Sequence, residues 1–113
     1  MRAYSVEYSP IALEDLRAIY SYIATELKAD QAAKQQGSRI RTQIKALSRM
    51  PERYHKVDWE PWQSMGMRKL PVDNYVVYYL SDVENRRAIV VRIVYRGRNI
   101  EEIIREDNNG NTQ

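Results

Sequence analysis

Alternating and periodic apolar positions near the start of the chain predict a strand followed by a helix. Residues 4–8 alternate between apolar and polar side chains, which is the period of a half-buried strand. Ser9 and Pro10 then supply a helix N-cap and a first helical residue. Apolar side chains recur after them at steps of three and four residues, so we predict an amphipathic helix over about residues 10–28.

A second amphipathic helix is predicted directly after the first. Asp30 is suited to be its N-cap, and small and aliphatic residues form one apolar side as far as Leu47. Pro51 limits this helix to residue 50, because proline inside a helix removes a hydrogen bond. Two helices joined by so short a connection are expected to pack as an antiparallel hairpin.

Three strands are predicted in close succession after an irregular segment, residues 51–66. The strands cover residues 67–72, 75–80 and 88–95, and they are rich in β-branched and aromatic side chains. The middle strand is apolar throughout, so we expect both of its faces to be covered.

The pattern ends with a short helix over residues 100–106, for which Asn99 is a suitable N-cap. The polar residues 107–113 are predicted to be a frayed tail. One strand, two helices, three strands and a helix give a helical hairpin packed on a mainly antiparallel sheet, an α+β fold. We expect a single domain over residues 1–106, since 113 residues suit one core.

Composition restricts the chemistry that this domain can perform. The chain has no cysteine and a single histidine, His55, which excludes thiolate nucleophiles, iron–sulfur clusters and zinc sites with several histidines. We therefore expect no metal and no cofactor. No apolar run approaches the roughly 20 residues of a membrane span, and the start lacks a signal sequence, so we expect a cytoplasmic protein without a membrane partner. A net charge of +3 permits a nucleic-acid partner.

Cations and a tyrosine on the predicted strands are the side chains that remain for chemistry. In an antiparallel meander the first and last of the three strands flank the middle one, so we expect their cations to gather on one face. Such cations stabilise the charge that forms when an RNA 2′-hydroxyl attacks its phosphate, and a tyrosine stacks on bases. The candidates are Arg68, Lys69, Arg92, Tyr95, Arg96 and Arg98.

Structural interpretations of these residues remain open alongside the functional ones. Side chains alternate along a strand, so at most one of Arg68 and Lys69 can face such a site. Arg92 lies in an apolar run, and its alternative role is a structural ion pair with a carboxylate such as Asp73 or Glu7. His55 is a candidate RNA contact or a solvated loop residue. Arg39, Arg41, Lys45 and Arg49 on the second helix form a solvated face or a phosphate-contacting row.

Four segments of the chain resemble the RelE/ParE toxin superfamily, and together they span about residues 4–104. They are Ala-Leu-Glu-Asp-Leu-Arg-Ala-Ile-Tyr-Ser-Tyr-Ile (12–23), Leu-Ser-Arg-Met-Pro (47–51), Arg-Lys-Leu-Pro-Val-Asp-Asn-Tyr-Val-Val-Tyr-Tyr (68–79) and Val-Val-Arg-Ile-Val-Tyr-Arg-Gly-Arg-Asn-Ile (90–100). The resemblance implies the toxin of a bacterial type II toxin–antitoxin pair, which a cognate antitoxin neutralises by covering its helices and sheet. We expect Tyr20, Tyr22 and Ile103 to be incompletely buried and to bind this antitoxin.

The resemblance leaves two targets open. RelE-like members cut mRNA on the ribosome, and Lys69 and Arg98 match their catalytic lysine and arginine. ParE-like members share the fold but inhibit DNA gyrase, and the stretch 95–100 is closer to theirs. Val76 and Ile104 stand where RelE has an arginine and a tyrosine, a departure from RelE chemistry.

From this we predict ribosome-dependent mRNA cleavage without a metal. In this interpretation Lys69 and Arg98 stabilise the phosphate, Tyr95 orients a base, and Arg68, Arg92, Arg96 and His55 contact RNA. Gyrase inhibition without nuclease activity is the alternative, and a decayed toxin that only binds its antitoxin is a further one.

Overall fold

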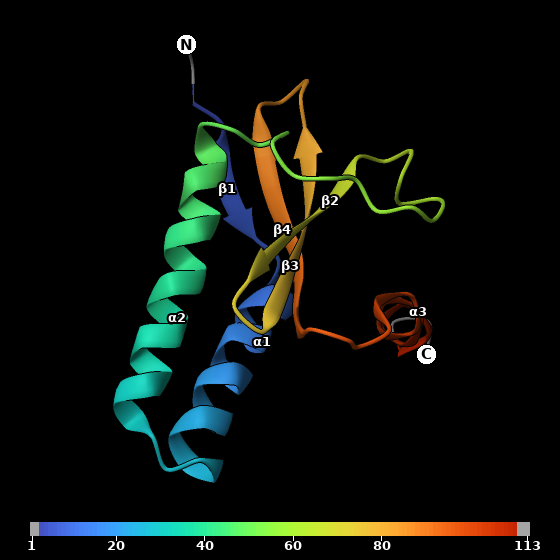
Figure 1. Cartoon of the computed structure of the whole chain (residues 1–113). Coiled ribbons are helices and arrows are strands. Elements are labelled where there is room, and N and C mark those ends of the chain that lie inside the picture. The colour runs from blue at the N-terminus through green and yellow to red at the C-terminus, as the bar shows by residue number, and fades with distance from the viewer. Residues whose placement is uncertain (1–2, 111–113) are drawn as a thin grey trace.

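Four strands form one mixed sheet in the computed structural model, which describes residues 3–110. The strands are β1 (Ser5–Tyr8), β2 (Met67–Val72), β3 (Tyr75–Asp82) and β4 (Arg87–Tyr95), in the order β1-β4-β3-β2. β3 pairs antiparallel with β2 and β4, as the meander predicts, whereas β1 pairs parallel with β4 (Figure 1). The predicted α+β class and order of elements are confirmed.

The first helix begins where the sequence predicts, but its regular α-helical part ends before the predicted residue 28. In α1 (Pro10–Ser21) the Ser9 hydroxyl oxygen accepts the Ala12 N–H at 3.0 Å, as an N-cap should. A π-helical turn, η1 (Tyr22–Glu26), then replaces the predicted last turns of α-helix. Lys28 adopts the left-handed conformation, with φ of 51°, and this ends the helical run.

The second helix differs from its prediction at both ends. α2 (Asp30–Lys45) has Ala29 at its N-cap position, so the predicted Asp30 cap is wrong, although an acidic residue in the first turn still suits the helix dipole. A 3₁₀ turn, η2 (Ala46–Ser48), tightens the other end. Regular helix therefore stops about a turn before the predicted residue 50.

The last helix, α3 (Ile100–Gly110), is longer than predicted. Asn99 caps it as expected, with its side-chain oxygen accepting the Glu102 N–H at 3.2 Å. Residues 107–110, predicted to be tail, are helical, and the rest of that tail lies outside the described residues. Within the described chain, no helix has the length and apolar character to cross a membrane.

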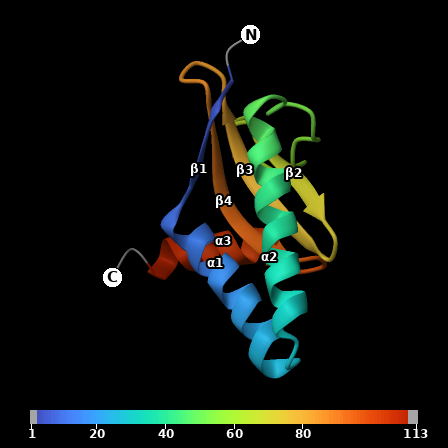
Figure 2. The ribbon, with the colours of Figure 1, turned by 90° about the vertical axis from the view of Figure 1, so that its left-hand side faces the viewer.

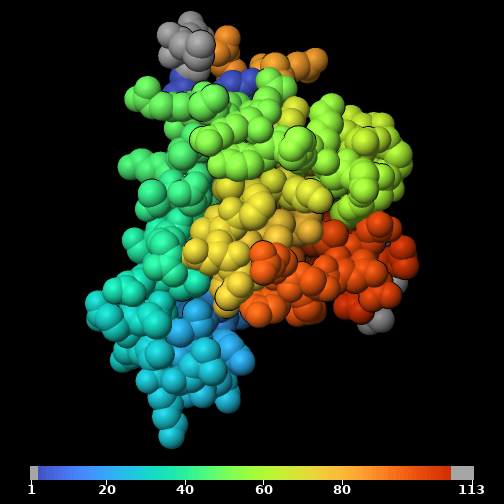
Figure 3. Space-filling model, in the orientation of Figure 1, coloured from blue at the N-terminus to red at the C-terminus, as the bar shows by residue number. Residues whose placement is uncertain are grey.

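Both faces of the sheet are covered, which explains the uniformly apolar β3. The helices α1 and α2 pack on one face, which we call the hairpin face (Figure 2), over a core that includes Leu70, Val77 and Tyr79. Residues 57–66 and α3 cover the other, the α3 face, where they lie next to each other (Figure 3). Tyr78 and Val94 lie in that second core with three isoleucines of α3.

A β-bulge in β4 decides which of its side chains point to which face. Tyr78 pairs with Arg92 and Tyr79 pairs with Val90, so Val91 is the extra residue. The bulge resets the alternation of side chains, and Arg92 therefore lies on the α3 face next to Val91. Beyond it, Tyr95 pairs with Tyr75 and shares the hairpin face with it.

Candidate functional site

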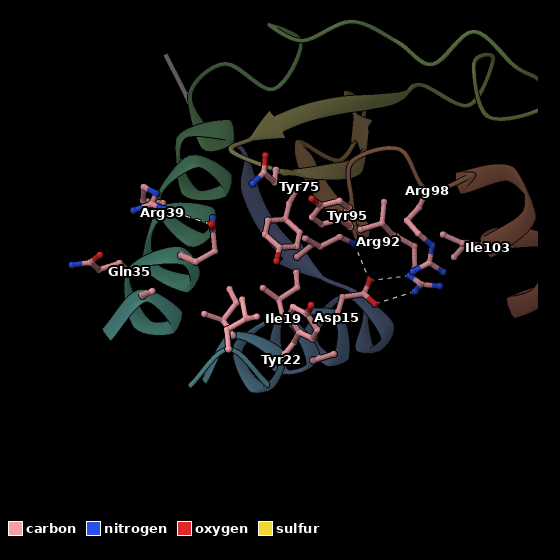
Figure 4. A pocket seen from close by; sticks show the side chains of 18 residues that line it. Asp15, Ile19, Tyr22, Gln35, Arg39, Tyr75, Arg92, Tyr95, Arg98 and Ile103 are labelled. Carbon is pink, nitrogen blue, oxygen red and sulfur yellow. Dashed lines mark hydrogen bonds and ion pairs between the residues drawn. The ribbon is translucent and has the colours of Figure 1, made fainter. Parts of the chain in front are cut away.

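An open groove of about 780 Å³ runs between the helical hairpin and the ends of β3 and β4 (Figure 4). Its apolar lining comes mainly from α1, η1 and the two strands, and includes Ile19, Ile23 and Ile93, while Ile103 of α3 closes one end. Three large apolar side chains along it are more than half exposed: Tyr22 at 55%, Leu27 at 57% and Tyr95 at 55%. Exposed apolar area on this scale is typical of a surface that binds a partner.

Two tyrosines form the strand side of the groove. Tyr75 and Tyr95 pack edge to face, with ring centroids 5.6 Å apart and planes at 89°. Burial raises the pKa of the Tyr75 hydroxyl, and the nearby Tyr95 and Tyr22 hydroxyls raise it further. Tyr75 therefore stays a neutral hydrogen-bonding group well into the alkaline range, while the exposed Tyr95 ring is open to contact.

An ion cluster joins three elements at one end of the groove. Arg92 donates two bonds to the Asp15 carboxylate of α1, at 2.8 and 2.9 Å, and one to Asp107 of α3 at 2.6 Å. Asp15 also accepts the Ile93 N–H at 2.8 Å. Burial lowers the pKa of the Arg92 guanidinium, but the bonds to Asp15 and Asp107 outweigh that effect and the net shift is upward.

The carboxylate partner expected for Arg92 is therefore present but differs from both residues that the sequence suggested. Glu7 lies within 3.6 Å of Arg87. The Asp73 carboxylate accepts hydrogen bonds from Arg39 Nε at 2.7 Å and Gln36 Nε2 at 2.9 Å. Both bonds lower the pKa of Asp73, and the bond from Arg39 has the larger effect. This second contact ties α2 to the turn between β2 and β3, across the groove from Arg92.

Of the strand cations predicted to gather on one face, Lys69 and Arg92 do so, because both pair with Tyr78 on the α3 face, whereas Arg68 lies on the other face. Lys69 is exposed and pairs with Tyr78, so its side chain lies on the α3 face. Tyr95 lies on the hairpin face, whereas Arg98 follows β4 and lines the end of the groove beside Ile103 of α3 (Figure 4), with its backbone N–H 3.2 Å from the Tyr95 carbonyl. Two of the three residues predicted to be catalytic, Lys69 and Tyr95, thus lie on opposite faces of the sheet, and the third, Arg98, lies in the turn after β4.

The remaining predicted RNA contacts are separate from one another. Arg68 points opposite to Lys69, as strand alternation requires, and donates to the carbonyls of Tyr54 at 2.6 Å and Glu52 at 3.3 Å. Its side chain is only 14% exposed, so the guanidinium anchors the start of the segment 51–66. Arg96 is exposed after β4, and His55 is exposed beside β2, where its carbonyl accepts the Lys69 N–H.

Comparison with known proteins identifies the family. A family model described as "ParE toxin of type II toxin-antitoxin system, parDE" matches residues 6–100. The chain belongs to this family. It is a type II toxin with the RelE/ParE fold, as the sequence resemblance implied.

Solved structures share this fold at low sequence identity. A chain from the chromosomal ParDE system of P. aeruginosa superposes with a TM-score of 0.66 at 22% identity, covering 82% of this toxin and 96% of that chain. The archaeal RelE–RelB complex from Pyrococcus horikoshii gives 0.59 at 14%, covering 86% and 99%. A substituted E. coli RelE toxin in the free state gives 0.59 at 15%, covering 84% and 85%. No curated protein sequence matches the toxin.

The toxin exposes two of the three residues expected to bind an antitoxin. Tyr20 is 39% exposed on α1, and Tyr22 is 55% exposed at the groove. Ile103 is only 7% exposed, because α3 folds its isoleucines onto the sheet, so the expectation of incomplete burial is wrong for this residue.

Sequence reasoning missed the carboxylates that organise the groove. Asp15 had the pattern of an ordinary polar helix position, and Asp107 was assigned to a tail. Neither has a local signal, because each gains its role only through Arg92. Within residues 3–110, no three histidine or carboxylate side chains lie close enough together to hold a metal ion.

Proposed function

We propose that this toxin inhibits growth by binding DNA gyrase rather than by cutting mRNA. The observation that carries the proposal is that Lys69 and Tyr95 lie on opposite faces of the sheet. Lys69 lies on the α3 face of the edge strand β2, whereas Tyr95 lies on the hairpin face and Arg98 lies after the end of β4, beside Ile103 (Figure 4). Catalysis of phosphate cleavage needs its charged groups within contact of one phosphate, and this arrangement does not provide that.

Membership of the ParE family, whose model matches residues 6–100, supports the same target, and residues 95–100 resemble ParE-like sequences more than RelE-like ones. Arg68 and Arg92 are engaged by neighbouring groups and are not available to a substrate. Val76 and Ile104 supply neither a cation nor an acid–base group. The exposed edge formed by Tyr95, Arg96 and Arg98 is then a protein-binding surface, since exposed tyrosine and arginine are the side chains enriched in such surfaces.

Ribosome-dependent mRNA cleavage is the second candidate, and one observation favours it. Tyr95 and Arg98 are both exposed and lie within one turn of the chain, joined by a backbone bond. A stacking ring beside a guanidinium suits a single-stranded nucleotide.

Two reactions with the same toxin preparation, made by cell-free synthesis, separate the candidates. We expect inhibition of gyrase supercoiling, and no breaks at A-site codons when a defined mRNA is translated and mapped by primer extension. Arg98→Ala should weaken gyrase inhibition by about tenfold or more, the usual loss for a residue at the centre of an interface. Lys69→Ala and the exposed control Arg105→Ala should not.

mRNA cleavage without inhibition of gyrase would contradict the proposal. Ribosome-dependent breaks that require both Lys69 and Arg98, with supercoiling unaffected, would establish mRNA cleavage instead. If the toxin has neither activity but still binds an antitoxin, it is a decayed toxin.

We propose further that a cognate antitoxin neutralises the toxin by covering the groove. Tyr22 and Leu27 offer exposed apolar contacts there, while Leu13 is comparably apolar but lies outside it at 40% exposure. Rescue of growth by the co-expressed antitoxin should fail for Tyr22→Ser with Leu27→Ser, and persist for Leu13→Ser. Equal rescue of the wild type, the Tyr22/Leu27 double variant and Leu13→Ser would contradict the role of the groove.

A further inference from the structure

The second helix and its 3₁₀ extension carry an unbalanced positive charge. Between residues 31 and 51 there are five lysines and arginines and no carboxylate. The same stretch contains no aromatic residue. The rest of the chain has 13 lysines and arginines against 15 acidic residues, so the positive charge of the toxin is concentrated on this one element.

Three of these cations form a row along one side of α2. At 100° per residue, Lys34, Arg41 and Lys45 fall within an arc of about 40°, which flanks the buried side on which Gly37 and Ile44 lie. All three are exposed, and none has an ion-pair partner in the described part of the chain. Arg39 differs, because Asp73 neutralises it on the groove side.

The local structure keeps this row open to solvent. α2 lies at the outer edge of the molecule, and no other element covers its outer side (Figures 1 and 2). Gly37 leaves room for Arg41 to lie back along the helix, where a guanidinium nitrogen comes within 3.3 Å of the place a Cβ would occupy. Arg49, exposed just beyond η2, extends the positive charge past the end of the helix.

The spacing of the row matches a nucleic-acid backbone. Lys34 and Lys45 are about 16 Å apart along the helix axis at 1.5 Å per residue. One strand of duplex DNA carries a phosphate about every 3.4 Å, so the row spans about five phosphates. A straight row of exposed cations without aromatic side chains fits a duplex, whose bases are already stacked, better than a single strand.

We propose that this exposed flank of α2 binds the phosphate backbone of duplex DNA through Lys34, Arg41 and Lys45. The contact is independent of sequence, because phosphates carry no direct base information. It is separate from the groove, which opens on the other side of α2, and it does not depend on which target the toxin inhibits. The toxin thereby has a surface that holds it on DNA.

Fluorescence anisotropy of a labelled 20-base-pair duplex, titrated with the full-length toxin from 50 to 200 mM salt, tests this. We expect a Kd of about 10⁻⁴–10⁻⁶ M near physiological salt, in the range of non-specific binding, and tighter binding at 50 mM. The triple variant Lys34→Gln, Arg41→Gln, Lys45→Gln should bind about tenfold more weakly. It should also lower the slope of log K against log salt by about 2.7, which is 0.9 for each lost phosphate contact.

A matched triple variant controls for net charge. Arg17→Gln, Lys56→Gln and Arg105→Gln remove the same charge from exposed positions on other elements, and should stay within about threefold of the wild type. Circular dichroism confirms that both triples fold. Equal losses in the two triples, or no binding by the wild type, would overturn the proposal. Duplex RNA of the same sequence binding more than about tenfold tighter would overturn DNA as the partner.

Discussion

Arg92 links α1, β4 and α3 through two carboxylates that are themselves largely buried. Its side chain is 15% exposed, and those of Asp15 and Asp107 are 13% and 28% exposed. Replacing such a residue leaves two acidic groups without compensation, which costs more than the pair itself contributes. The cluster is therefore a structural centre of the fold, although sequence pattern made Arg92 a candidate RNA contact.

Arg92→Met should lower the free energy of unfolding by about 2–4 kcal/mol, since it leaves Asp15 buried and unpaired. Urea denaturation followed by circular dichroism measures this. Arg87→Met is the control, because Arg87 is 40% exposed and its pairs with Glu7 and Asp82 should contribute under about 1 kcal/mol. Similar losses in the two variants would show that burial of the Arg92 cluster has no special energetic role.

Tyr79 makes stability sensitive to alkaline pH. Its hydroxyl donates to the Pro51 carbonyl at 2.7 Å, and burial raises the pKa of Tyr79 to about 12. Between pH 10 and 12 the unfolded chain loses this proton while the folded chain keeps it, so stability falls as pH rises. The stabilisation is fully present below pH 10, and the expected loss by pH 12 is about 2–3 kcal/mol.

Tyr79→Phe tests this assignment by urea denaturation at a series of pH values. The variant should lose about 1–2 kcal/mol at pH 8, because the Pro51 carbonyl keeps no partner. Its further decline between pH 10 and 12 should be shallower than that of the wild type. Tyr95→Phe removes an exposed tyrosine and should follow the wild-type curve. A parallel decline in Tyr79→Phe would assign the alkaline sensitivity to other tyrosines.

At the scale of elements, α3 is attached by a small set of contacts. Three isoleucines pack it on the α3 face, and Asp107 joins it to Arg92. The helix contributes a hydrophobic cover for Tyr78 and Val94 but pairs with no strand. An element held in this way opens locally at lower free energy than the sheet beneath it.

Asp107→Asn should loosen α3 alone. The charged bond to Arg92 is partly exposed and contributes about 1 kcal/mol, so hydrogen exchange of the α3 amides should accelerate about fivefold. Exchange in β3 should not change, because Asp15 still holds Arg92. Glu106→Gln, at an exposed neighbouring position, is the matched control. Acceleration throughout the sheet would show that α3 does not open as a separate unit.

At the scale of the whole molecule, Lys69 and Arg98 lie on different parts of the fold, Lys69 in the edge strand β2 and Arg98 after the end of β4, which is not a neighbour of β2. Residues without shared partners usually have additive effects, whereas members of one catalytic site do not. In a double-mutant cycle of Lys69→Ala and Arg98→Ala, the coupling energy derived from inhibition curves should stay below about 0.5 kcal/mol. A coupling above about 1 kcal/mol would place the two side chains in a common site and favour mRNA cleavage.

Local sequence patterns were sufficient for most of the elements. Alternation and β-branched residues predicted the strands closely, and β2 has the predicted bounds. The Ser9 cap and Asn99 cap were predicted because capping depends on residues only three positions away. The ends of α1 and α2 were less accurate, since Lys28 and Ala29 adopt conformations that apolar periodicity does not encode.

The sequence by itself determined the α+β class, the order of the elements, the positive second helix and the family resemblance, because these depend on neighbours within a few residues. Only the tertiary structure decided which side chains meet. The Val91 bulge sets the faces of Arg92 and Tyr95, and the Asp15–Arg92 contact joins residues 77 positions apart. Such pairings arise from the packing of whole elements, and no local pattern records them.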